Sequence, residues 1–212
     1  IDVDYTGSGY TGTYTGTALN VEDYRPEATD SEGNTNTLVW GYTLKEGAED
    51  DEYEVALSVK DAGEYTVYFT INAEGHAPYY GSYIINIRNA KITVSDVVSH
   101  NKTYDGKEHT PVTANVTTVG GNEAKWSFKL NQFDEYDANL TLKNAGDYTV
   151  YYMISADNHD AVTGTIDASI ALAAFSDINV EAYNAAYDGN EHGAVVGTPT
   201  VTVVGENTPV WK

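Results

Sequence analysis

The chain repeats itself at an interval of 83 residues, and this repetition limits its possible folds more than any other feature of the sequence. Residues 51–81 align with residues 134–164 without a gap, and 15 of the 31 aligned positions are identical. Tyrosine-x-glycine triplets that begin at Tyr14, Tyr104 and Tyr187 each precede a tryptophan by 22 to 26 residues. Self-similarity at a fixed period indicates an array of structural units. We therefore predict two complete units and the first strands of a third, at residues 1–90, 91–174 and 175–212.

Hydrophobic residues alternate within each unit with a period of two. Every second position of residues 65–71 and 148–154 carries Tyr, Val, Phe or Ile, which is typical of a strand with one buried face. No long segment shows a helical period, so helices should be absent or limited to a single turn. Short strands separated by turns predict an all-β fold of antiparallel sandwiches. Further strands are predicted at residues 112–119, 125–130, 140–142 and 165–171, with a turn at 120–122.

One motif makes the predicted sandwich immunoglobulin-like. The segments 61–67 (DAGEYTV) and 144–150 (NAGDYTV) have the spacing of a tyrosine corner, with valine in the position of the second cysteine of antibody domains. The hydroxyls of Tyr65 and Tyr148 should donate to the backbone near residues 61 and 144, because a buried hydroxyl without a partner is costly. The upstream tryptophans should lie on strand C and be buried between the two sheets, Trp40 against Val67 and Trp126 against Val150.

These motifs resemble the tandem bacterial immunoglobulin-like repeats of the YDG type, which occur in large secreted and cell-surface proteins, adhesins among them. The resemblance rests on the Tyr-Asp-Gly triplet, on the tyrosine-corner strand and on Asn158-His159 followed by Gly164. The first unit departs from the pattern at Thr15 and at Gly75, so its first turn is expected to differ. The resemblance implies an extracellular stalk or adhesive repeat, and it carries over no catalytic residue.

Charge and composition argue against several classes of function. The chain carries 32 Asp and Glu but 11 Lys and Arg, a formal net charge of −21, so its surface repels nucleic-acid phosphates and anionic lipid. It has no cysteine and no apolar run long enough to span a membrane. Solvated charge is the ordinary explanation of the acidic clusters at residues 49–52 and 134–135, and the histidines lack the spacing of a zinc site. We predict no catalytic activity, no bound cofactor, and no nucleic-acid or membrane partner.

Calcium is the metal ion most compatible with this acidic sequence. It takes six to eight oxygen ligands, which acidic linkers between tandem sandwiches can supply. No Asp-x-Asp-x-Asp-Gly loop is present, however. The alternative is that the carboxylates only keep an extracellular protein soluble. The candidate calcium ligands lie near the predicted junctions of the units and are Asp96, Asp157, Asp160, Asp177 and Glu181.

Tyrosines raise a second possibility, the recognition of a host glycan or protein. Tyrosine rings stack on sugar rings and anchor protein partners at a low entropy cost. The alternative, which we favour, is that they are strand tyrosines that cover a sheet edge. The candidate ligand-binding residues are Tyr5, Tyr10, Tyr14, Tyr79 and Tyr80.

The connections between the units bear on how the array behaves. Residues 88–91 and 171–174 contain no Gly-Ser-rich or Pro-rich stretch, which favours a semi-rigid rod over flexible beads. We predict a structural stalk of a bacterial cell-surface or secreted, adhesin-like protein, in which neighbouring repeats of the same chain are the partners. The alternatives are an adhesive module for glycan or host protein, and an accessory region of a secreted carbohydrate-active enzyme.

The partial third unit lacks the strands that would cover its apolar residues. Either the unit continues in a longer array, or it pairs with another chain by strand exchange. Without the missing strands, five valines should be exposed beside open strand edges: Val195, Val196, Val201, Val203 and Val204.

Overall fold

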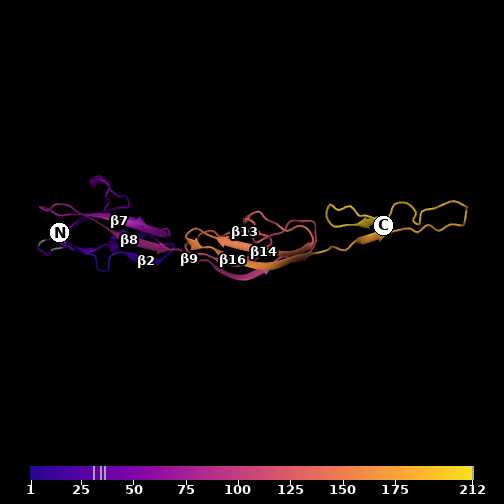
Figure 1. Cartoon of the computed structure of the whole chain (residues 1–212), viewed down its shortest axis with the longest axis horizontal. Coiled ribbons are helices and arrows are strands. Elements are labelled where there is room, and N and C mark those ends of the chain that lie inside the picture. Colours follow the sequence, from indigo (N-terminus) through magenta and orange to yellow (C-terminus); the bar gives the residue numbers. More distant parts are fainter. Residues whose placement is uncertain (31, 34, 36, 212) are drawn as a thin grey trace. The chain divides into compact units, whose positions relative to one another are not determined.

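The computed structural model describes residues 1–30, 32, 33, 35 and 37–211 and consists of strands and loops (Figure 1). No α-helix occurs among these residues, and the helical turns are single 3₁₀ turns, η1 (Val21–Tyr24) and η2 (Asp50–Glu52), as predicted. The fold is therefore an all-β sandwich fold. No helix in the described part of the chain is long and apolar enough to cross a membrane.

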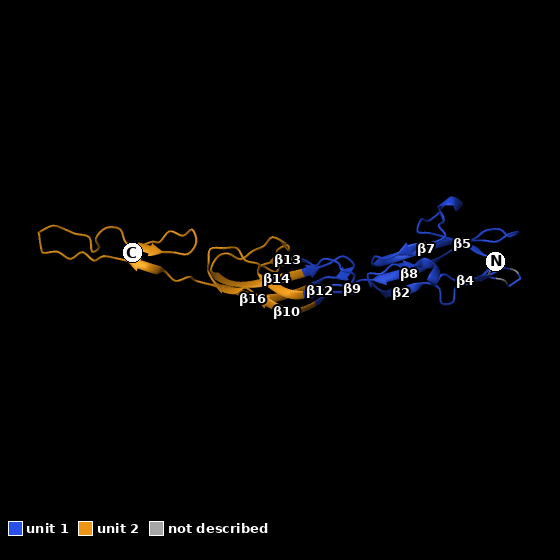
Figure 2. Ribbon diagram, turned by 180° about the vertical axis from the view of Figure 1, so that it is seen from behind, with its two compact units in different colours: residues 1–93, 116–125, 154–162 blue, residues 94–115, 126–153, 163–212 orange. Residues whose placement is uncertain are grey.

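The chain divides into two compact units (Figure 2). Unit 1 comprises residues 1–93, 116–125 and 154–162, and unit 2 comprises residues 94–115, 126–153 and 163–212. Two loops of the second sequence repeat thus belong to unit 1. The domain boundaries predicted at residues 90 and 174 remain predictions.

Unit 1 is built on a four-stranded sheet with the order β2-β8-β7-β5. The long strands β7 (Gly63–Asn72) and β8 (Tyr79–Arg88) pair antiparallel, β5 (Val39–Thr43) pairs antiparallel with β7, and β2 (Tyr10–Thr13) runs parallel to β8. Shorter pairs complete the unit: β1 (Asp2–Asp4) with β4 (Glu27–Thr29), β3 (Leu19–Asn20) with β6 (Ser58–Val59), and β9 (Ala90–Lys91) with β15 (His159–Asp160).

The core of unit 1 confirms the period of two on β7. Val67, Phe69 and Ile71 are fully buried. Of the two residues between them, Tyr68 is partly covered and Thr70 is buried with 5% of its surface exposed. Tyr42 and Ile85 from the neighbouring strands are also fully buried. Alternating side chains point to opposite faces of a strand, so this apolar set forms one continuous inner layer.

The second repeat forms an equivalent sheet, most of it in unit 2. Its order is β11-β16-β14-β13. The strands are β11 (Asn101–Thr103), β16 (Val162–Ala171), β14 (Gly146–Ser155) and β13 (Lys125–Lys129), and β10 (Thr93–Ser99) pairs with β12 (Val112–Thr117). Its buried core consists of Val112, Phe128, Leu142, Val150, Ala168 and Ile170. The strands predicted from residues 112, 125, 148 and 165 are confirmed, as is the turn at 120–122.

The predicted strand at residues 140–142 is wrong. Leu142 forms an isolated bridge with His109, and its N–H and C=O each make a 2.9 Å bond to that residue. The next hydrogen-bonded pair of an antiparallel ladder would require a donor from Pro111, which has no N–H. The pairing therefore stops after one residue.

Both tyrosine corners are confirmed. Tyr65 donates to the carbonyl oxygen of Asp61 at 2.9 Å, and Tyr148 donates to that of Asn144 at 2.6 Å. Each bond spans only four residues, so the motif determines it locally.

The tryptophans lie on strands β5 and β13 and pack against the two core clusters, as predicted, but they are buried less than predicted. Trp40 and Trp126 are partly buried, and their rings lie 5.2 Å from Phe69 and 5.9 Å from Tyr152, two residues beyond the valines expected as partners. For Trp40 the reason is the strand register, which pairs it with Ile71 near the end of the sheet. The fully buried ring on β5 belongs to Tyr42 instead.

The backbone of the first turn is the same in the three units, but one side-chain contact differs, as expected. Asp105 and Asp188 each bond to a histidine four residues on, whereas the first unit has Thr15 and Leu19 at these positions. Gly16, Gly106 and Gly189 have φ values of +79°, +79° and +82°. In the first unit the Thr15 hydroxyl accepts the backbone N–H of Thr17 at 3.3 Å. In the second repeat the Asp105 carboxylate accepts the backbone N–H of Lys107 at 2.9 Å. A hydroxyl closes this turn as a carboxylate does, though more weakly.

In the tail beyond residue 171, β17 (Ser176–Asn179) pairs antiparallel with β18 (Thr200–Thr202), and Ala182 forms an isolated antiparallel bridge with Val195. None of the described tail residues belongs to either core cluster. The exposure of the tail agrees with the prediction for three valines. Val195, Val196 and Val204 are 38%, 48% and 36% exposed, whereas Val201 and Val203 are partly covered.

Candidate functional site

Within unit 1, two loops of the second repeat pack against turns of the first repeat. We call this set of contacts the unit 1 junction. On one side lie the triplet that begins at Tyr14, the corner residues 61–62 and the connection 89–90. On the other side lie the turn 119–122 and the loop 157–160. All of these residues belong to unit 1.

Glycines bring two turns of the unit 1 junction into contact. A Cβ on Gly120 would lie 2.7 Å from the hydroxyl oxygen of Tyr14 and 2.9 Å from Cα of Gly16. The backbone of Gly120 has φ = +71°, a conformation that favours glycine. Beside it, Asn122 Nδ2 donates to the buried Tyr14 hydroxyl at 3.2 Å and to the carbonyl of Asp157 at 2.9 Å.

Asn158 uses its side-chain amide and its carbonyl in the junction. Its Oδ1 accepts the N–H of Ala62 at 2.8 Å, and its Nδ2 donates to Asp61 Oδ1 at 3.0 Å. Its backbone C=O accepts the N–H of Ala90 at 2.9 Å. The residue has φ = +64°, which asparagine tolerates better than most side chains. The backbone carbonyl of Asp61 also accepts the Tyr65 hydroxyl, so the tyrosine corner is the part of the first repeat to which Asn158 binds.

His159 is 7% exposed, and both of its ring nitrogens have partners. Nδ1 lies 2.7 Å from the carbonyl of Asp157, and Nε2 lies 2.9 Å from the backbone N of Val119. A carbonyl only accepts and an N–H only donates, so the ring must be neutral with its proton on Nδ1. The ring also meets Tyr14 edge-on at a centroid distance of 5.9 Å.

Sequence reasoning missed these roles. It noted Asn158-His159 as part of a motif and residues 120–122 as a turn, but assigned neither to a contact. One usable signal was the recurrence of Val-Gly-x-Asn at residues 119–122 and 204–207. A surface turn needs a glycine and polar residues, but it does not need an asparagine at one fixed position. The repeated asparagine therefore indicates a specific contact.

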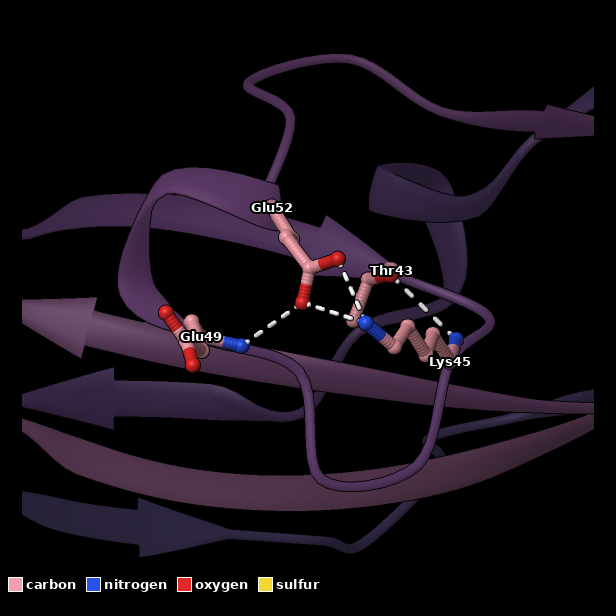
Figure 3. A network of polar contacts seen from close by, with 4 residues as sticks. All are labelled: Thr43, Lys45, Glu49 and Glu52. Carbon is pink, nitrogen blue, oxygen red and sulfur yellow. Dashed lines mark hydrogen bonds and ion pairs between the residues drawn. The ribbon is translucent and has the colours of Figure 1, made fainter.

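The acidic cluster at residues 49–52 has a structural explanation (Figure 3). Glu52 accepts the Glu49 N–H at 2.9 Å and pairs with Lys45 Nζ at 2.5 and 2.7 Å, while the Lys45 N–H donates to the Thr43 hydroxyl at 3.2 Å. The hydrogen bond from Lys45 is the main reason why the pKa of Glu52 is lowered. These interactions cap the exposed 3₁₀ turn η2.

The structure does not gather the five candidate calcium ligands. Asp96 accepts a bond from Asn115 at 2.7 Å, Asp160 accepts one from Asn89 at 3.2 Å, and Asp157 lies 4.0 Å from Lys125 Nζ. Asp177 and Glu181 are exposed in the tail. Among the residues described, no three His, Cys, Asp or Glu side chains are grouped so that they could hold a metal ion. Calcium binding remains a prediction.

The five candidate tyrosines separate into different environments. Tyr14 is buried in the core, which removes it from the candidates for sugar stacking. Tyr10 is partly buried against Tyr24 at 4.8 Å, and the exposed Tyr80 donates to Asp50 at 2.6 Å.

Tyr5 and Tyr79 lie together, with their hydroxyl oxygens 3.5 Å apart. Burial is the main reason why the pKa of Tyr5 is raised to about 12. Tyr5 and Tyr10 also line a shallow groove of about 560 Å³. Glycan or protein recognition at this groove remains a prediction.

Comparison with known proteins yields no family assignment. No protein-family model matches the chain, and no curated protein matches it. Among solved structures it is similar to the fibronectin(III)-like modules of Clostridium thermocellum CbhA, with 12% identity, a TM-score of 0.31, and coverage of 81% of this chain and 94% of that one.

Two further similar structures are protocadherins. Extracellular cadherin domains 3–6 of protocadherin gamma B2 show 12% identity and a TM-score of 0.32, with coverage of 94% of this chain and 55% of that one. The EC3-6 cis-dimer structure of protocadherin gammaB7 shows 13% identity and a TM-score of 0.28, with coverage of 92% and 54%. The chain thus spans about half the length of both protocadherin structures, and the likeness concerns the fold alone.

Proposed function

We propose that this chain is a structural spacer made of tandem immunoglobulin-like repeats, part of a bacterial cell-surface or secreted, adhesin-like protein. The observation that carries the proposal is the composition of unit 1. Residues 116–125 and 154–162 of the second repeat belong to the same compact unit as the first sandwich. The YDG-type motifs of the sequence support the extracellular, bacterial assignment.

The junction contacts supply the mechanism of the spacer. The connection at Ala90–Lys91 is itself paired with His159–Asp160, so it is not a free linker. Bending there would break the bonds of Asn158 and His159, each of which contributes about 0.5–1.5 kcal/mol net. Several such bonds acting together make a semi-rigid connection, which transmits force and keeps its length.

Electron spin resonance distance measurements test this proposal. The chain has no native cysteine, so labels on Thr66→Cys and Thr165→Cys, both at exposed strand positions, are unique. We expect a narrow distance distribution for the otherwise unchanged chain. Combining Asn158→Ala with His159→Ala should broaden it, because the loop then loses its partners.

The matched control is His76→Ala. It removes the corresponding histidine from the exposed loop of the first repeat, and it should leave the distribution narrow. A broad distribution in the unchanged chain would contradict the semi-rigid spacer and favour flexible beads.

A further inference from the structure

Unit 2 contains a pocket at the place that corresponds, in the repeat, to the unit 1 junction. It has a volume of about 470 Å³, and residues of the second repeat and of the tail both line it. Aromatic and aliphatic side chains dominate its wall. Its lining includes Tyr104, Ala145, Ala173, Phe175, Val204 and Asn207.

Half of the junction is already formed in unit 2. The N–H of Tyr104 donates to Ala171 at 2.8 Å, as that of Tyr14 donates to Arg88 at 2.8 Å. Asn207 Nδ2 donates to the Tyr104 hydroxyl at 3.2 Å, the same distance as between Asn122 and Tyr14.

The glycine contact also recurs. A Cβ on Gly106 would lie 2.8 Å from Cα of Gly205. The contact between the Tyr-x-Gly turn and the Gly-x-Asn turn therefore occurs twice in this chain.

The other half of the junction is missing from unit 2. In unit 1 the loop 157–160 occupies the N–H groups of Ala62, Ala90 and Val119. The counterparts of these residues are Ala145, Ala173 and Val204. None of these three N–H groups has a hydrogen-bond partner within the part of the chain that the structure describes, and all three residues line the pocket.

We infer that this pocket is the docking site for an Asn-His loop, carried by the β-hairpin that would complete the third sandwich. Its asparagine Oδ1 would accept from Ala145, its asparagine C=O from Ala173, and its neutral histidine Nε2 from Val204. The histidine ring would pack edge-on against Tyr104, as His159 packs against Tyr14.

The chemistry of the pocket favours asparagine over glycine. The side chain at this position must accept from the Ala145 N–H, and an asparagine would also bond to the side-chain amide of Asn144, the counterpart of Asp61, whereas glycine has no side chain to do either. The corresponding loop of the first repeat carries Gly75-His76 and is exposed. Without an amide, that loop lacks the side chain that bonds to the tyrosine corner. The pocket should therefore bind the hairpin that carries Asn158-His159 and not the hairpin that carries Gly75-His76.

Peptide titration of the full chain tests the inference. We would add a backbone-cyclised hairpin with the sequence of residues 150–166 at millimolar concentration and follow the amide resonances of Ala145, Ala173 and Val204. Saturable shifts of all three are expected. The hairpin of residues 67–83, which has Gly75-His76, is the matched control, and so is the first hairpin with Asn158→Gly. The two control hairpins should bind at least about tenfold more weakly than the hairpin of residues 150–166. The substitution Asn144→Leu in the protein should weaken binding of the 150–166 hairpin by a similar factor.

Three outcomes would overturn the inference. The first is the absence of saturable shifts at the three amides, and the second is equal binding of the Asn-His and Gly-His hairpins, as expected of a merely apolar pocket. The third is a response confined to β17 or β18, which would indicate strand pairing at an open edge. The inference deepens the proposed spacer function, yet this titration can fail while the spin-label distance across the first connection stays narrow.

Discussion

The unit 1 junction and the pocket of unit 2 are the same arrangement at two stages of completeness. Both have a tyrosine hydroxyl bonded to an asparagine at 3.2 Å and two glycines in close approach. Only in unit 1 do Asn158 and His159 complete it. The turn contact depends on the early strands of a repeat alone, whereas the loop contact needs the late strands.

The largest effect should come from Gly120→Ala. It adds a methyl group against Tyr14 and Gly16 and also strains a positive φ, so we expect the free energy of opening the junction to fall by about 2–5 kcal/mol. Hydrogen exchange of the Ala62 and Ala90 amides measures this. Gly121→Ala is the control, because Gly121 has nearly the same φ, +72°, with no atom within 4 Å of an added Cβ. It should cost about 1–2 kcal/mol, and equal losses in the two variants would show that the turns do not touch.

His159→Ala should have the next largest effect. It leaves the Val119 N–H without an acceptor and removes a buried ring, which should destabilise unit 1 by about 2–4 kcal/mol in urea unfolding. His76→Ala, in the exposed loop of the first repeat, should stay within about 0.5 kcal/mol. A similar loss of stability in both variants would contradict the junction, in which the loop of His159 is buried against the first repeat and the loop of His76 is exposed.

Gly205→Ala repeats the Gly120 clash in unit 2 but should have a small global effect. The added methyl group would lie 2.7 Å from the Tyr104 hydroxyl, so the side-chain amide signals of Asn207 should change. Exchange protection of β14 and β16 should change by less than about 0.5 kcal/mol, since the tail adds nothing to their core. Loss of protection there as large as that caused by Gly120→Ala would show that the partial repeat supports the second sandwich.

The smallest effect concerns the pH dependence of the Asp-His turn. It tests whether this turn forms equally in the complete second repeat and in the partial third repeat. Hydrogen bonds from His109 and His192 are the main reason why the pKa values of Asp105 and Asp188 lie below their ordinary value of 3.8. A lowered carboxyl pKa stabilises the fold above the ordinary value, and this stabilisation is lost as the pH falls through the lowered pKa. Carboxyl NMR titration should show both shifts. His109→Ala should return Asp105 toward 3.8 and leave Asp188 unchanged. A shift at Asp105 alone would show that this turn, too, needs a complete repeat.

Local chemistry explains which sequence predictions were correct. Tyr65 and Tyr148 reach carbonyls only four residues away, and the period of two on β7 places Val67, Phe69 and Ile71 inside whatever the partner strand is. The burial of Trp40 was overestimated because it depends on the register between β5 and β7, which no residue near Trp40 reveals. Leu142 failed to extend a strand because of Pro111, a residue distant in the sequence.

The sequence by itself determined the all-β repeat, its longer strands, its tyrosine corners and its glycine turns, because each depends on alternation or turn chemistry over a few residues. Only the tertiary structure decided that these turns meet. The bonds that join Ala62 to Asn158 and Tyr14 to Asn122 span 96 and 108 residues. Contacts at such separations depend on how two sandwiches place their loops. Asparagine and histidine, unremarkable as loop residues, acquire their partners only there.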